Sequence, residues 1–240
     1  MLRIKYCELL YEHGYETKTM IKKGGYHILK KLAIFDIDYT ITKKETLTEL
    51  FKYVIKNDKR NIRFLPRAIY CGSMYGLRIY DERKVKEEFL KFIDGIREQD
   101  LAKLVRKFYD EKLKTIVYED AIKMIKKLKN EGYDIYLISA SPEFYINEFY
   151  NIKEVDKIIG TKFNFKDGIF TRTMDGKNCK GEEKVRRLKE VLKNEKIEVD
   201  FKESYMFSDS LSDKPLLDLV GKPYLINYRK KHDIEILKWK

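Results

Sequence analysis

The chain has 240 residues, of which 43% are hydrophobic and 38% charged, and its net charge is +12. This length fits one large domain or a domain that carries an insertion, and it is sufficient for a full buried core. The composition excludes an intrinsically disordered chain and indicates a soluble globular protein. The longest stretch without charge, residues 68–77, is too short for a transmembrane segment.

The cysteines and the N-terminus predict a reduced, cytoplasmic protein. Cys7, Cys71 and Cys179 are widely spaced and odd in number, so they form neither a disulfide framework nor a zinc-binding pattern. No apolar segment followed by a small-residue cleavage site stands at the N-terminus, and we therefore expect no signal peptide.

The positive charge has three interpretations: contact with nucleic acid, contact with an anionic membrane surface, or attraction of anionic substrates. Lysines are spread over almost every predicted helix and are mixed with glutamates. Interspersed charge is typical of solvated helix faces. We therefore expect no specific nucleic-acid partner.

In chain order, residues 1–30 are interpreted as an N-terminal extension of unknown role, since glycines interrupt any long element. The next four residues, Leu32 to Phe35, are all apolar, which is typical of a strand buried on both faces. Asp36 and Asp38 follow directly, and carboxylates two residues apart on an extended backbone point to the same side. They repel each other unless a cation or proton lies between them, so this motif predicts either a magnesium site or simply an acidic turn.

Residues 46–115 are predicted to form an inserted all-helical cap. Four apolar stripes repeat here at helical spacing, and we interpret each as a packing face. The uncharged stretch 68–77 could line the pocket beneath a lid or contact a membrane surface. Burial within the cap is the preferred interpretation.

From residue 118 onwards strands and helices alternate. The expected elements are a helix over residues 121–128, a strand over 135–138, a hairpin over 158–173, a helix over 182–192, strands over 205–207 and 223–226, and a last helix from about Lys231. This alternation predicts an α/β fold with a Rossmann-like parallel sheet covered by helices on both faces. Residues 31–45 and 116–240 form the expected core.

Three of the predicted strands end in polar residues, and one helix starts near a lysine. In a parallel sheet such strand ends lie at one edge and can surround one site. The sequence resembles the haloacid dehalogenase superfamily, in particular its phosphoserine-phosphatase-like branch (subfamily IB). The four motifs of that branch are matched in order by Asp36, Asp38 and Thr40; by Ser139; by Lys184; and by Asp209 with Asp213.

The resemblance implies a phosphatase that hydrolyses a small phosphorylated metabolite through an aspartyl-phosphate. Asp36 is the implied nucleophile, and Asp38 the implied general acid and base. Mg²⁺ is the implied cofactor, bound by Asp36, the backbone carbonyl of Asp38 and Asp209. Asp213 is implied to orient the metal's ligands.

The same resemblance implies which residues bind the phosphate. Ser139 donates a hydrogen bond to it, and Lys184 pairs with it and with Asp36. Thr40 and Ala140 complete the expected substrate-binding set.

The chain departs from the branch at two positions. Tyr39 stands where the family often has glycine. Ala140, Ser141 and Pro142 follow Ser139, whereas phosphoserine phosphatases usually have Ser-Gly-Gly, so phosphoserine itself is an open alternative as substrate.

Two rival hypotheses place the chain in a different functional class or location. In the first, it is a basic nucleic-acid-binding protein on a degenerate catalytic fold. In the second, it is a phosphatase bound to a membrane surface through residues 68–77.

Overall fold

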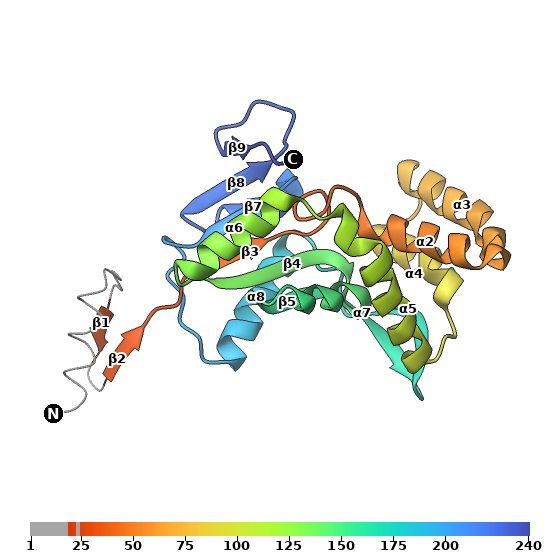
Figure 1. Cartoon of the computed structure of the whole chain (residues 1–240), viewed down its shortest axis with the longest axis horizontal. Helices are drawn as coiled ribbons and strands as arrows, with labels where there is room; N and C mark the ends of the chain where they lie inside the picture. Colours follow the sequence, from red (N-terminus) through yellow and green to blue (C-terminus); the bar gives the residue numbers. More distant parts are fainter. Residues whose placement is uncertain (1–18, 23–24) are drawn as a thin grey trace.

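The computed structural model describes residues 19–22 and 25–240 (Figure 1). Most of the predicted N-terminal extension, and Cys7 with it, lies outside these residues. Within them, β1 (Thr19–Lys22) and β2 (Gly25–Ile28) pair as an antiparallel two-stranded sheet.

The remaining described strands form one seven-stranded sheet in the order β6-β5-β4-β3-β7-β8-β9. Every neighbouring pair is parallel except β5 with β6, which form the predicted hairpin around Asp167 and Gly168. Both turn residues have a positive φ, as a tight hairpin turn requires. The strands are β3 (Leu32–Phe35), β4 (Asp134–Pro142), β5 (Val155–Lys166), β6 (Ile169–Asp175), β7 (Tyr205–Ser208), β8 (Lys222–Ile226) and β9 (Glu235–Leu237).

Helices cover both faces of this sheet, which confirms the predicted Rossmann-like α/β fold. On β3, Ala33 and Phe35 belong to one buried cluster, which includes residues of α6, and Leu32 and Ile34 belong to a second, which includes residues of α8 and α9. All four side chains are fully buried, because β3 is central and its side chains point alternately to the two covered faces of the sheet. The helical elements here are α6 (Glu119–Asn130), α7 (Glu143–Ile146), η4 (Asn147–Asn151), α8 (Glu182–Asn194), η5 (Leu211–Asp213) and α9 (Lys214–Leu217).

A series of helical elements runs from Thr46 to Ile116, over the segment 46–115 predicted as a cap. A backbone bridge between Thr42 and Val117 brings the two ends of this segment together beside β3. Whether the segment is a separate cap domain stays a prediction. Its elements are α2 (Thr46–Asn57), η1 (Lys59–Phe64), α3 (Leu65–Gly76), α4 (Glu82–Phe89), η2 (Leu90–Ile93), α5 (Glu98–Glu111) and η3 (Leu113–Ile116).

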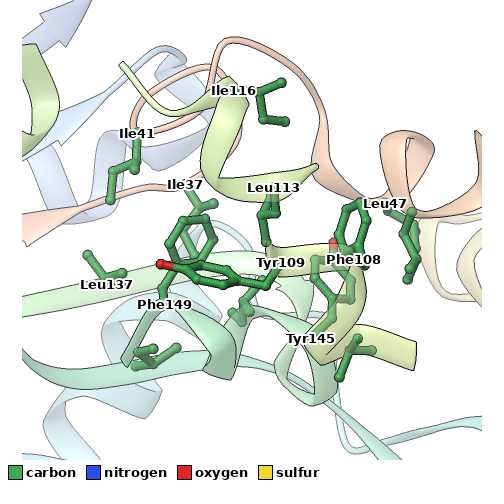
Figure 2. Packing of buried hydrophobic residues seen from close by; sticks show 14 of the residues in the cluster. Ile37, Ile41, Leu47, Phe108, Tyr109, Leu113, Ile116, Leu137, Tyr145 and Phe149 are labelled. Carbon is green, nitrogen blue, oxygen red and sulfur yellow. The ribbon is translucent and has the colours of Figure 1, made fainter. Parts of the chain in front are cut away.

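The helical segment and the sheet share one buried cluster (Figure 2). Phe108 of α5 is fully buried and its ring meets the rings of Tyr53 and Tyr145, with centroids 5.5 and 6.4 Å apart. Ile37 and Leu137 belong to the same cluster from the end of β3 and the middle of β4. The helices are thus anchored directly over the strand ends.

Two sequence predictions are wrong. The expected last helix from Lys231 is instead the strand β9, because Ile234 and Ile236 pack on one core cluster while Leu237 and Trp239 pack on the other. Such alternation has the period of a strand.

The preferred burial of residues 68–77 is also wrong. Of the side chains in α3 only Cys71 is buried, and Ile69 remains 63% exposed. The helix packs through a narrow side on which Ala68 and Cys71 lie, and Leu65, Tyr70 and Tyr75 also remain exposed. Among the helices of the described chain, none has the length and apolarity needed to cross a membrane.

Candidate active site

The candidate site lies at the carboxyl edge of three adjacent strands. Asp36 follows β3, Ser139 lies near the end of β4, and Asp209 follows β7. The sheet order places β3 between β4 and β7, and the Asp36 backbone N–H donates to the Phe207 carbonyl at 2.9 Å. Three of the motifs predicted from the sequence therefore meet at one edge.

Lys184 joins two of these motifs. It lies in the first turn of α8, which starts after Gly181 with a φ of 56°. Its Nζ donates to Asp36 Oδ1 and to Asp213 Oδ2, both at 2.7 Å, and Ser208 Oγ donates to the same Asp213 oxygen at 2.9 Å. The Lys184 side chain is 2% exposed, so this is a buried ion-pair network.

The network contains more negative than positive charge. Burial raises the pKa of Asp36, and Asp213 and Asp38 raise it further against the opposing effect of Lys184. Burial, followed by the charge of Asp213, also raises the pKa of Asp209 to about 6. Burial opposes the charge of Lys184, but Asp36 and Asp213 raise its pKa above the usual value.

Asp38 is fixed by two groups that the sequence prediction did not include. Its Oδ1 accepts from the Thr46 backbone N–H at 2.7 Å, and its Oδ2 accepts from Ser141 Oγ at 2.6 Å. Ser141 also donates its backbone N–H to Ser139 Oγ at 3.1 Å. The i, i+2 relation that pairs Asp36 with Asp38 applies equally to Ser139 and Ser141, and it could have identified Ser141.

Thr40 connects the loop after β3 with the loop after β7. Its side chain is fully buried, and its hydroxyl accepts from the Asp209 backbone N–H at 2.8 Å. This contact positions the loop after β7, whereas contact between Thr40 and substrate stays a prediction. Tyr39 beside it has a φ of 57°, a conformation that glycine adopts at lower cost.

A polar cluster from α4 and the loop before α8 contacts Ala140. Lys86 Nζ donates to the Ala140 carbonyl at 2.5 Å and to Asn178 Oδ1 at 2.7 Å. Asn178 Nδ2 donates in turn to Glu82 Oε2 at 2.8 Å, and Lys180 forms an ion pair with Glu82. No sequence signal identified this cluster, because its members meet only through tertiary packing.

The charge balance suits a bound divalent cation. The site holds four carboxylates, those of Asp36, Asp38, Asp209 and Asp213, and the ammonium of Lys184 pairs with Asp36 and Asp213. With all five side chains ionised, their formal charge is −3. Oxygen donors with excess negative charge are what Mg²⁺ prefers. Within residues 19–22 and 25–240, no group of three His, Cys, Asp or Glu side chains is arranged as a ready metal centre.

Comparison with known proteins identifies related chains. Histidinol-phosphatase of Neisseria meningitidis serogroup C is 27% identical over 209 residues, which cover 83% of this chain and 91% of that protein. A protein of unknown function from Bordetella pertussis has the same fold, with a TM-score of 0.77 at 22% identity, covering 84% of this chain and 92% of the other. A substrate-bound phosphoserine phosphatase structure superposes with a TM-score of 0.60 at 19% identity, covering 88% of this chain and 94% of the other.

The family described as haloacid dehalogenase-like hydrolase matches residues 33–218, which span the strand ends, the helical segment and Lys184. These residues contain the four motifs quoted from the sequence. The chain therefore belongs to the haloacid dehalogenase-like hydrolases.

Proposed function

We propose that this enzyme is a Mg²⁺-dependent phosphatase that hydrolyses a small phosphate monoester through an aspartyl-phosphate on Asp36. The observation that carries the proposal is the contact of Lys184 with both Asp36 and Asp213 at the strand ends. The enzyme belongs to the phosphoric monoester hydrolases, the class to which the names of related proteins also point.

Asp36 is the nucleophile. One carboxylate oxygen attacks phosphorus, the ester P–O bond breaks, and the leaving alkoxide takes a proton from Asp38. Water then attacks the phosphorus of the aspartyl-phosphate and gives a proton to Asp38. This step breaks the bond between Asp36 and phosphorus, releases inorganic phosphate and restores both carboxyl groups. The Thr46 N–H and the Ser141 hydroxyl hold Asp38 in one orientation for these two transfers.

Lys184 and Ser139 stabilise the phosphoryl group. The ammonium lies 2.7 Å from the Asp36 oxygen, so it is placed to offset charge that accumulates where nucleophile and phosphate meet. Ser139 Oγ accepts from Ser141, and a hydroxyl that accepts can still donate its own hydrogen. The substrate phosphate receives that hydrogen bond.

Asp36, the carbonyl of Asp38 and Asp209 hold Mg²⁺, while Asp213 supports the site from its contacts with Lys184 and Ser208. When bound, the cation neutralises part of the charge that the buried carboxylates and the substrate share. Phosphoserine is the alternative substrate. Lys86 beside the Ala140 carbonyl is placed to contact an anionic group of the substrate other than the phosphate.

The test is hydrolysis of para-nitrophenyl phosphate by the purified chain with Mg²⁺. Asp36→Asn should lower kcat by about a thousandfold or more, because the amide is not a nucleophile. Asp175→Asn, an exposed carboxylate at the end of β6, is the matched control and should retain activity. Unchanged turnover by Asp36→Asn rejects the proposal. A panel of phosphorylated metabolites that includes phosphoserine and histidinol phosphate then identifies the substrate.

A further inference from the structure

One surface of the helical segment exposes an unusual number of large apolar side chains. Seven of the eleven exposed large hydrophobic residues in the described chain lie within residues 59–80, and their exposed fractions range from 42% to 66%. Ile62, Ile69, Leu77 and Ile79 are each more than half exposed. A concentration of this kind on one short segment marks an interaction surface. We refer to residues 59–80 as the basic apolar surface.

The charge of this surface has one sign. Residues 59–80 contain five basic side chains and no acidic one. Arg60 pairs with Asp58 and Arg67 with Glu88, both outside the segment. Lys59, Arg63 and Arg78 have no carboxylate within ion-pair distance among the residues described here, and all three are exposed. Exposed apolar and cationic side chains are therefore interspersed along one short segment.

We propose that the basic apolar surface docks on a lipid bilayer with anionic headgroups. Anionic headgroups complement the arginines, and the apolar side chains enter the interfacial layer. The helix α3 has 12 residues and is too short to span a bilayer, so it lies in the plane of the interface. A second copy of the chain fits this surface less well, because pairing the same surface would oppose like charges.

The position of α3 suits such docking. It lies at the outer edge of the helical segment, away from the sheet (Figure 1). The Arg67–Glu88 ion pair joins α3 to α4, and α4 carries Lys86, whose Nζ contacts the Ala140 carbonyl at the active site. The helix α4 therefore links the docked helix to the active site.

The experiment is flotation of the full chain with two kinds of vesicle, phosphatidylcholine alone and two parts phosphatidylcholine to one part phosphatidylserine. The chain should float with the anionic vesicles and remain unbound with the neutral ones. Arg63→Gln with Arg78→Gln should weaken binding about 25-fold, since each basic residue near an anionic surface contributes about fivefold. Ile69→Gln with Leu77→Gln should abolish flotation, because it removes apolar side chains that enter the interfacial layer. Both side chains are largely exposed in the free protein, so the variant should fold normally.

Matched controls separate the surface from general charge and apolarity. Lys189→Gln with Lys193→Gln removes two exposed charges from α8, and Ile169→Gln removes an apolar side chain that is 42% exposed elsewhere. These variants should float like the unaltered chain, and all variants should hydrolyse para-nitrophenyl phosphate in solution as it does. The proposal is overturned if the unaltered chain fails to float, if it floats equally with neutral vesicles, or if the two surface variants bind as the controls do. It is also overturned if the chain is a dimer that Ile69→Gln with Leu77→Gln dissociates, because a second copy then occupies the surface.

Discussion

Lys184 sets the electrostatic balance of the site at the scale of single residues. Its ammonium is buried between Asp36 and Asp213, and charges in such surroundings are stable only when they are paired. In the sequence it is one lysine among many, and only its place after a glycine at a helix start distinguishes it. Lys86 and Asn178 carry no such signal, because α4 and the loop before α8 approach each other only in the folded chain.

Lys184→Met should lower the free energy of unfolding by about 3 kcal/mol near pH 7, since it leaves two buried carboxylates without a cation. Because burial raises the pKa of Asp36, this carboxyl becomes neutral as the pH falls, and the defect should shrink in acid. Urea denaturation at several pH values without added metal measures this. Lys189→Met, an exposed position on the same helix, is the control. An equal defect at every pH would refute the ion-pair interpretation.

Lys86 should give a pH dependence in a more alkaline range. Burial lowers its pKa from 10.5 to about 8, partly offset by Asp38, so the unfolded chain binds this proton more strongly than the folded chain. Stability therefore rises with pH between these two values. In Lys86→Met this contribution is absent, and the unaltered chain should gain about 3 kcal/mol over the variant between about pH 7 and about pH 11. If the free energies of unfolding of the unaltered chain and of Lys86→Met differ by the same amount at every pH in this range, Lys86 is not desolvated.

At the scale of elements, the ends of the strands decide the geometry of the site. The sequence predicted β3, β4 and β7 because apolar runs end there in polar residues. It failed for α3, because an apolar stretch does not reveal whether its partner lies in the same chain. It failed for β9, because the run of alternating apolar residues there is too short to distinguish a strand from a helix in the sequence.

The close approach of β5 to the end of β4 offers a test at this scale. A Cβ added at Gly160 would lie 2.7 Å from the Ser141 carbonyl oxygen and 2.6 Å from Ile146 Cδ1. Gly160→Ala should therefore cost about 1–3 kcal/mol of stability. It should also lower phosphatase activity, because displaced Ser141 no longer holds Asp38. Thermal unfolding and turnover measure the two effects.

Gly72→Ala is the matched control for that substitution. Nothing lies within 4 Å of a Cβ added at Gly72, which is inside α3. Alanine there should raise stability by about 0.5–1 kcal/mol, since glycine disfavours helix interiors. Equal behaviour of the two alanine variants would contradict the close packing at Gly160.

At the scale of the whole molecule, the helical segment and the sheet form one core around Phe108 (Figure 2). Trp239 belongs to the same cluster. Phe108→Ala should therefore lower the free energy of unfolding by about 3–5 kcal/mol. Trp239 is the one tryptophan of the chain, so its fluorescence reports the sheet. Phe108→Ala should move the urea midpoints of the Trp239 fluorescence and of the helical circular dichroism by the same amount. A Trp239 transition that Phe108→Ala leaves unmoved would show that the helices unfold separately.

The central claim is that Asp36, supported by Lys184 and Asp213, receives the phosphoryl group of the substrate. The most direct measurement is rapid quenching of the enzyme during turnover, followed by peptide mass spectrometry. The account predicts one phosphoryl group on the peptide that contains Asp36, and none in Asp36→Asn. Steady hydrolysis with no phosphorylated peptide, or with the phosphoryl group on another residue, would contradict it.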